Sequence, residues 1–193
     1  MRLHVFDVAL RVPFRGLTRR SGVVMEGRAG WAEWSPFPEY DDREAASWML
    51  AALEAAEEGY PTAVRGRVEV NGIVPALGPA EAAARAVASR CRTIKIKVAA
   101  AGEGLADDVA RVAAVRSALP EARIRVDANG GWSLPEARAA LRELAPLGLE
   151  YAEQPCATVE DLAALRAMGL GVPIAADEST RRAADPLRVR DAG

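Results

Sequence analysis

The stretch TIKIKV (93–98) alternates apolar side chains with two lysines. In a β-strand, successive side chains point to opposite faces, so the two isoleucines and Val98 face one way and Lys95 and Lys97 the other. Of the 25 Lys and Arg residues in the chain, these are the only lysines. Chance in an arginine-rich composition is the competing interpretation, but unpaired lysines are rare in an otherwise apolar strand. The stretch therefore predicts a strand that presents two amines to a chemical site.

Strand and helix patterns alternate on both sides of this stretch. Further strands are predicted at 68–76, 122–127, 149–153 and 172–177, and helices at 78–90, 103–119, 133–148, 158–169 and from 185 onward. Such alternation predicts right-handed βαβ units around a parallel sheet. A doubly wound fold is the alternative to a barrel, but LGPAEA (77–82) stands where its glycine-rich dinucleotide fingerprint would follow the first strand. We therefore expect a TIM-type (β/α) barrel.

The first 67 residues predict a separate, smaller α+β unit. The expected elements are a strand at 3–12, a mobile polar loop GLTRRSG (16–22), strands at 23–27 and 31–37, and a helix at 43–59 ending at Gly59, with Ala46, Met49, Leu50 and Leu53 on its apolar face. PTAVRGR (61–67) is a connector. The predicted fold class is thus α/β: an α+β domain over 1–67, then the first five βα units of a barrel over 68–193.

Three of the later strands end on an acid: Asp127, Glu153 and Asp177. A lone acid there is equally well a helix N-cap. Three in consecutive units, after a strand with two lysines, indicate a shared site, because the carboxyl ends of parallel barrel strands converge. Carboxylates are ligands for hard cations, and the only histidine, His4, is distant in sequence, so Mg²⁺ is expected, with Mn²⁺ as the alternative. Cys156 is interpreted as a packing residue.

These residue types together indicate one kind of chemistry. A divalent cation held by three carboxylates can bind a substrate carboxylate and stabilise the enediolate that forms when the α-proton leaves. A lysine beside a second ammonium and a dication has its pKa pushed down, which suits a base. The sequence therefore predicts proton abstraction next to a carboxylate.

Composition excludes several other classes of function. A net charge of −2 gives no electrostatic reason for nucleic acid or an acidic membrane surface as partner. No apolar run reaches the roughly 18–20 residues needed to span a bilayer. The N-terminus alternates like a strand rather than a signal peptide, and two cysteines make no disulfide framework. We expect a cytosolic enzyme for a small-molecule substrate, of undetermined oligomeric state.

The same residues carry a resemblance to a known family. KIK (95–97), VDANG (126–130), EQP (153–155) and ADES (176–179) resemble, in order and spacing, the motifs on barrel strands two to five of the muconate-lactonizing-enzyme-like branch of the enolase superfamily. GWAEWSPFPEY (30–40) resembles the capping-domain hairpin of o-succinylbenzoate synthases from actinobacterial-type sources. The resemblance extends over essentially the whole chain.

The resemblance implies a role for each site residue. Lys97 would be the acid/base, with Lys95 as its electrostatic neighbour. Asp127, Glu153 and Asp177 would bind Mg²⁺, Asn129 and Glu178 would support the site, and the loop 14–22 of the capping domain would close over the substrate. The implied reaction is the syn dehydration of 2-succinyl-6-hydroxy-2,4-cyclohexadiene-1-carboxylate to o-succinylbenzoate, in menaquinone biosynthesis.

The chain departs from this family pattern in length. A (β/α) barrel takes about 250 residues, and only about 125 follow residue 68. Strands six to eight of the (β/α)7β barrel, and the second catalytic lysine, are expected beyond Gly193, so the 193-residue chain alone is expected to be inactive. Two alternatives remain open: an N-acylamino acid racemase or dipeptide epimerase of the same superfamily, and a non-catalytic half-barrel that binds a metal or a partner.

Overall fold

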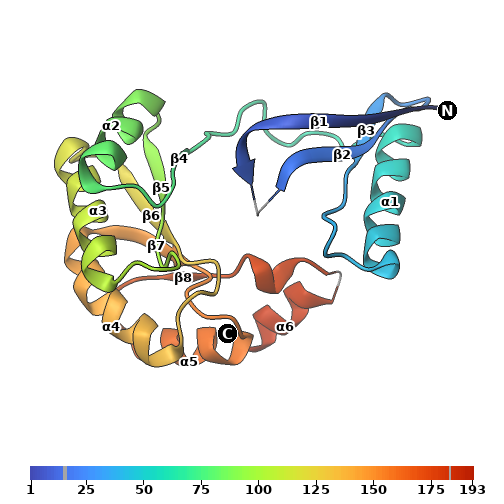
Figure 1. Ribbon diagram of the computed structural model, residues 1–193. Helices are drawn as coiled ribbons and strands as arrows, with labels where there is room; N and C mark the ends of the chain where they lie inside the picture. The colour runs from blue at the N-terminus through green and yellow to red at the C-terminus, as the bar shows by residue number, and fades with distance from the viewer. Residues whose placement is uncertain (15–16, 183) are drawn as a thin grey trace. The chain divides into compact units, whose positions relative to one another are not determined.

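The computed structural model describes residues 1–14, 17–182 and 184–193. The chain divides into two compact units, Met1–Arg67 and Val68–Gly193 (Figure 1). Within the described ranges, no helix is long and apolar enough to cross a membrane.

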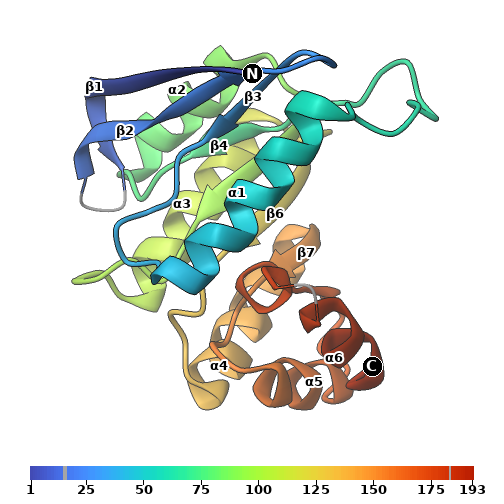
Figure 2. The same ribbon diagram turned by 90° about the vertical axis from the view of Figure 1, so that its right-hand side faces the viewer.

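The first unit is a three-stranded antiparallel sheet with one helix. The sheet has the order β1-β2-β3, and its strands and helix are β1 (Arg2–Phe14), β2 (Leu17–Glu26), β3 (Trp31–Trp34) and α1 (Asp42–Glu57). Helix α1 packs against β2 and β3 (Figures 1 and 2). Met25, Ala32, Ala52 and Ala56 form the buried core between them. The predicted α+β unit is thus observed.

The predicted loop GLTRRSG (16–22) is wrong for residues 17–22, which belong to β2. Their polar side chains are satisfied across the strand pair, because Arg19 Nε lies 2.9 Å from Asp7 Oδ2 and Ser21 Oγ lies 2.9 Å from Asp7 Oδ1. Polar residues here mark an exposed strand face rather than a loop. Residues 15 and 16, part of the segment predicted to close over the substrate, lie outside the described residues.

The predicted apolar face of α1 is partly wrong. Met49 and Leu53 pack against the core as predicted, but Ala46 is exposed and Leu50 is 68% exposed. The buried positions are instead Ala52 and Ala56. The backbone of Gly27 comes so close to α1 that a Cβ there would lie 2.3 Å from the Ala56 carbonyl oxygen, so position 27 has no room for a side chain. The helix ends at Glu57, and its C-cap is Glu58 rather than the predicted Gly59.

The second unit is a five-stranded parallel sheet in the order β4-β5-β6-β7-β8. Its strands are β4 (Gly72–Val74), β5 (Thr93–Lys97), β6 (Arg123–Asp127), β7 (Leu149–Glu153) and β8 (Ile174–Ala175). Helices α2 (Pro79–Ser89), α3 (Leu105–Ala118), α4 (Leu134–Leu144), α5 (Val159–Ala167) and α6 (Asp185–Asp191) follow them in alternation, with short 3-10 turns η1 (Ala145–Leu147) and η2 (Glu178–Thr180). The α2–α5 helices form an arc along one side of the sheet (Figure 1). The predicted five βα units of an open barrel are confirmed.

The edge strands are shorter than predicted. Of the stretch 68–76 only Gly72–Val74 pairs, and Val68 and Val70 are 78% and 76% exposed. Likewise, only Ile174–Ala175 of 172–177 forms strand. Each pairs with a neighbour on one side alone in the part of the chain that the structure describes. A strand that is paired on one side forms only half the backbone hydrogen bonds of an inner strand. The apolar sequence pattern therefore extends further than the strand itself.

The central strands β5, β6 and β7 are stabilised by buried apolar side chains on one face. Ile94 and Ile96 of β5, Ile124 and Val126 of β6 and Ala152 of β7 are at most 1% exposed and pack against the helices. The register aligns Lys97 with Asp127, and Asp127 with Glu153. The last residues of three neighbouring strands therefore lie at one level.

Candidate active site

Strands β5, β6 and β7 bring the two lysines and two of the predicted acids together. Ile94 and Ile96 are fully buried, which leaves Lys95 and Lys97 on the opposite face of β5. The Lys95 side chain is 18% exposed and that of Lys97 is 34% exposed. The predicted alternation of TIKIKV is confirmed, and both amines reach the level at which the strands end.

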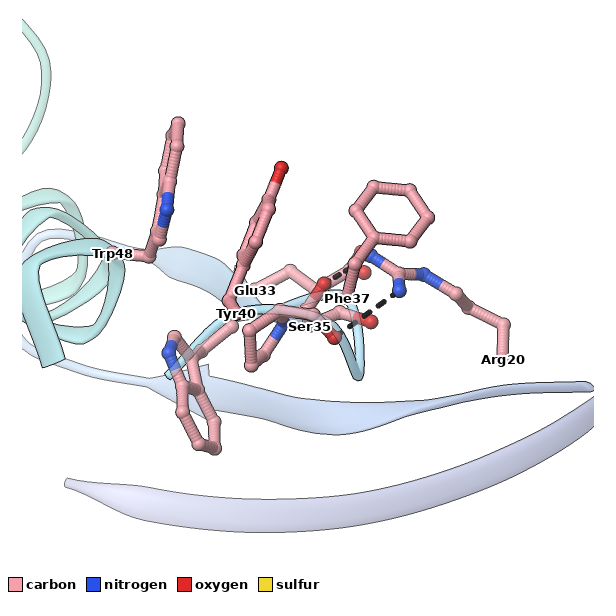
Figure 3. A pocket seen from close by; sticks show the side chains of 8 residues that line it. Arg20, Glu33, Ser35, Phe37, Tyr40 and Trp48 are labelled. Atoms are coloured by element: carbon pink, nitrogen blue, oxygen red, sulfur yellow. Dashed lines mark hydrogen bonds between the residues drawn. The ribbon is translucent and has the colours of Figure 1, made fainter. Parts of the chain in front are cut away.

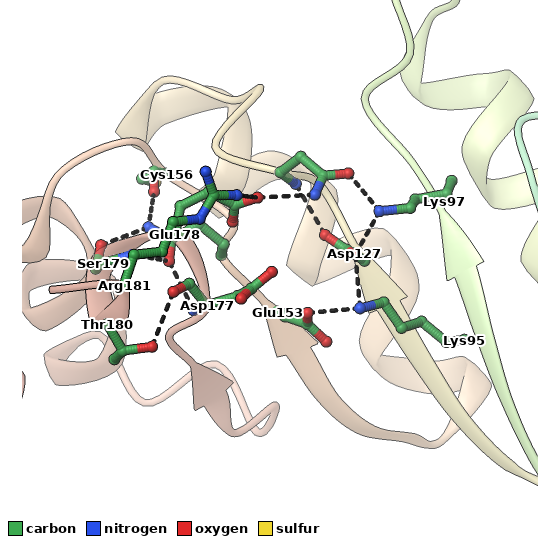
Figure 4. Close-up of polar contacts among 12 residues, drawn as sticks. Lys95, Lys97, Asp127, Glu153, Cys156, Asp177, Glu178, Ser179, Thr180 and Arg181 are labelled. Carbon is green, nitrogen blue, oxygen red and sulfur yellow. Dashed lines mark hydrogen bonds and ion pairs between the residues drawn. The ribbon is translucent and has the colours of Figure 1, made fainter. Parts of the chain in front are cut away.

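Both ammonium groups converge on Asp127, whose side chain is fully buried (Figure 4). Lys97 Nζ lies 2.6 Å and Lys95 Nζ 2.9 Å from Asp127 Oδ2. Lys95 also donates to Glu153 Oε1 at 2.6 Å, and Lys97 donates to Asn129 Oδ1 at 2.6 Å. Lys95 therefore bridges two carboxylates, while Lys97 bonds to one carboxylate and one amide.

The pKa values follow from these contacts. Burial raises the pKa of Asp127, but hydrogen bonds from Lys97 and Lys95 outweigh it, so the net pKa is lowered. Burial raises the pKa of Glu153, and the nearby charges of Asp127 and Asp177 add to this; Lys95 only partly offsets them. Burial alone would lower the pKa of Lys95, but its two carboxylate partners raise it overall. For Lys95 this is opposite to the direction expected from neighbouring positive charge.

The third predicted acid, Asp177, lies just beyond β8. Its charge contributes to the raised pKa of Glu153, so these two carboxylates lie within each other's electrostatic reach (Figure 4). The next residue, Glu178, accepts a hydrogen bond at Oε1 from Asn129 Nδ2 at 3.0 Å. Asn129 thus joins Lys97 to Glu178. All seven residues predicted for the site are found in one connected region of the second unit.

The donor set fits a hard divalent cation in its chemistry. Asp127, Glu153 and Asp177 offer only oxygen, and among the described residues Glu178 Oε2 is the one buried side-chain N or O atom without a hydrogen-bond partner. Across the same residues, however, no three acids, histidines or cysteines are already gathered as a metal cluster. Lys95 forms ion pairs with the carboxylate oxygens of Asp127 and Glu153 that a cation would bind. The carboxylates would need to exchange this partner to hold an ion.

Sequence reasoning missed two residues beside the site. Arg111 is 1% exposed and its Nη1 donates to the Lys97 carbonyl oxygen at 3.1 Å and to Asp108 Oδ1 at 2.8 Å. Its signal was a charged pair spaced i, i+3 on a helix face that is otherwise apolar. Gln154 is fully buried and is the only glutamine in the chain. It belongs to the motif EQP (153–155), which does not reveal its hydrogen-bond partners.

The predicted hairpin 30–40 contributes to a cavity within the first unit. The cavity has a volume of about 290 Å³ and is lined by Arg20, Glu33, Trp34, Ser35, Pro36, Phe37, Tyr40 and Trp48 (Figure 3). The Arg20 guanidinium lies 4.2 Å from the centre of the Phe37 ring and donates to the carbonyl oxygens of Ser35 and Pro36. Arg20, predicted in a mobile loop, instead fixes this hairpin segment.

Comparison with known sequences identifies two matching domains. Residues 5–56 match the family described as enolase N-terminal domain-like, and residues 79–193 match enolase C-terminal domain-like. The o-succinylbenzoate synthase of Thermobifida fusca is 55% identical over 188 residues, covering 97% of this chain and 59% of that protein. The o-succinylbenzoate synthase of Mycolicibacterium smegmatis is 54% identical over 191 residues, covering 97% and 58%. The chain therefore spans less than two thirds of the length of these relatives.

Solved structures show the same fold. An o-succinylbenzoate synthase from Thermosynechococcus elongatus, complexed with Mg in its active site, matches with a TM-score of 0.72 at 23% identity, over 98% of this chain and 72% of that one. A dipeptide epimerase from Cytophaga hutchinsonii, complexed with Mg and the dipeptide D-Ala-L-Val, matches with a TM-score of 0.76 at 23% identity, over 98% and 68%.

Proposed function

Because this chain belongs to the enolase superfamily, we propose that it supplies the proton-abstracting site of a Mg²⁺-dependent o-succinylbenzoate synthase. The observation that carries the proposal is the convergence of Lys95 and Lys97 on Asp127 at the carboxyl ends of parallel strands. Curated relatives at 49–55% identity bear this name, which favours dehydration over racemisation. The substrate is a small-molecule carboxylate, and neither nucleic acid nor membrane is a partner. A cytosolic location stays a prediction.

The carboxylates Asp127, Glu153 and Asp177 are the proposed Mg²⁺ ligands, with Mn²⁺ as an alternative ion. The bound ion would neutralise the substrate carboxylate and the charge that develops as the α-proton leaves. Asn129 and Glu178 support the site, since the Asn129 amide joins Lys97 to the Glu178 carboxylate. The unpaired Glu178 Oε2 supports a further polar partner there.

The two lysines take different roles in the proposed reaction. Lys95 is the more buried amine and, as an ammonium, stabilises negative charge on the substrate. Lys97 is the more exposed amine and removes the α-proton. In a syn elimination the hydroxyl leaves from the same face, so the ammonium formed on Lys97 is placed to return that proton to the departing oxygen. The products are o-succinylbenzoate and water. The proton that Lys97 removes leaves in the water, so Lys97 ends in its starting protonation state.

The test is turnover by the complete polypeptide of the gene, because this chain spans 59% of its T. fusca relative. We expect conversion of 2-succinyl-6-hydroxy-2,4-cyclohexadiene-1-carboxylate that is lost with EDTA and restored by Mg²⁺. N-acylamino acids and dipeptides are assayed in parallel. Epimerisation without dehydration would reject the proposal in favour of the racemase or epimerase alternative. The 193-residue chain, assayed beside it, is expected to be inactive.

A further inference from the structure

The Gln154 side chain is hydrogen-bonded to its full capacity. Its Oε1 accepts from the backbone N–H of Asp177 at 2.9 Å and of Ser179 at 3.2 Å. Its Nε2 donates to the Cys156 carbonyl oxygen at 2.9 Å and to Ser179 Oγ at 2.8 Å. A primary amide offers two donors and two acceptor lone pairs, and all four are used. This buried side chain therefore joins the end of β7 to the turn that follows β8.

The Gln154 backbone extends the same connection. Its N–H donates to the Ala175 carbonyl oxygen at 2.7 Å, and its own carbonyl oxygen accepts from Gly130 N–H at 2.7 Å. Its φ of +39° lies in the left-handed region that a residue with a Cβ rarely adopts. Such a conformation persists where the surroundings over-determine it. Gln154 thus holds the loops after β6, β7 and β8 together.

The three proposed ligands differ in how their backbone is held. Asp127 lies inside the sheet, in register with Lys97 on one side and Glu153 on the other. Pairing between β7 and β8 ends at Glu153 and Ala175, so Asp177 lies two residues beyond the last paired position. Among the described residues no paired strand holds its backbone N–H, and that N–H donates to Gln154 Oε1.

We propose that Gln154 is a positioning residue that holds the backbone beyond the end of the β7–β8 pairing and sets the place of Asp177 in the site. The inference rests on the proposed function, in which Asp177 binds the ion. Residues behind a ligand orient it, and losing one typically weakens metal binding 10- to 100-fold. Methionine at position 154 would have a similar length and no hydrogen bond, so the N–H groups of Asp177 and Ser179 would lose their partner.

The test compares Gln154→Met with Asn71→Leu in the complete polypeptide. Asn71 also carries an amide, but its Nδ2 donates to the Gly72 carbonyl oxygen at 3.4 Å, outside the site. For Gln154→Met we expect the Mg²⁺ dissociation constant, measured by calorimetry, to rise at least about tenfold. Amide hydrogen exchange at 177–180 should speed up, and excess Mg²⁺ should partly restore turnover. Asn71→Leu should leave all three unchanged.

Each outcome decides the proposal. A folded Gln154→Met protein with wild-type Mg²⁺ affinity and wild-type exchange at 177–180 overturns it. Should Gln154→Met not fold, Ser179→Ala decides instead, because it deletes one acceptor of Nε2; a smaller, roughly twofold to fivefold, loss of Mg²⁺ affinity supports the proposal, and unchanged affinity overturns it. A wild-type protein that binds no Mg²⁺ rejects the proposed function, while hydrogen exchange at 177–180 still decides the role of Gln154.

Discussion

Asp127 is the residue on which the site depends, because it is fully buried and pairs with both lysines of the chain. The two lysines look equivalent in the sequence, but they have different hydrogen-bond partners around Asp127. Lys95 bonds to two carboxylates and has a raised pKa, whereas Lys97 bonds to Asp127 and to the Asn129 amide. The sequence alternation predicted that both amines share a face. It could not predict this difference, because the partners of each amine come from other strands.

Arg111 provides a prediction at the residue scale. Arg111 and Asp108 are 1% and 2% exposed, and burial raises the pKa of Asp108 although Arg111 opposes this. Arg111→Met leaves a buried carboxylate without its cation, so we expect the free energy of unfolding to fall by about 3–5 kcal/mol in urea denaturation. Arg116→Met is the control on the same helix. Among the described residues, Arg116 donates to the carbonyl oxygens of Pro120, Ala122, Leu147 and Gly148 and to no carboxylate, and we expect a smaller loss, about 1–3 kcal/mol. Equal losses would contradict the account.

At the scale of elements, apolar periodicity predicted the helices and central strands of the second unit well. The prediction from apolar periodicity failed in the first unit, where side-chain exposure and specific contacts determine the structure. The polar residues of 17–22 form a strand because Arg19 and Ser21 find Asp7 across the pair. On α1 the small Ala56 is buried where the backbone of Gly27 comes close to it, whereas the larger Leu50 is 68% exposed. Hydrophobicity alone does not contain this steric information.

The N-terminus of α4 gives a pH-dependent prediction. Hydrogen bonds to Glu136 from the Ser133 hydroxyl at 2.6 Å and the Ser133 N–H at 2.8 Å lower the pKa of Glu136. The folded pKa lies below the unfolded one, so this contribution to stability is present at neutral pH. It is lost as the pH falls from the ordinary glutamate value, about 4.3, through the folded pKa.

Glu136→Ala should therefore lower the melting temperature at pH 7, and the gap from wild type should narrow as the pH falls below about 4. Glu143→Ala, at an exposed glutamate of the same helix, is the control and should change the melting temperature little at any pH. A gap for Glu136→Ala that stays constant from pH 7 to pH 3 would contradict this helix-capping role.

At the scale of the whole molecule, the order of elements predicted the fold class and the meeting of the site residues. Parallel strands place their carboxyl ends together, so Lys97, Asp127 and Glu153 could be brought to one level from the sequence alone. The roles of Gln154 and Arg111 could not be predicted in this way. Gln154 bonds to Asp177 and Ser179 in another turn, and Arg111 reaches the Lys97 carbonyl oxygen of another element. Glu153 pairs with Lys95 rather than joining a ready metal cluster, which strand order does not reveal either.

The central claim is that Lys97 abstracts a proton at a site whose metal ligands are separate residues. The most direct measurement is turnover and Mg²⁺ binding of Lys97→Ala in the complete polypeptide. We predict that dehydration falls by about 10²–10⁴-fold, as expected for loss of a general base, while the Mg²⁺ dissociation constant changes little. A variant that binds Mg²⁺ and still dehydrates at the wild-type rate would contradict the account and favour a metal-binding module without catalysis at Lys97.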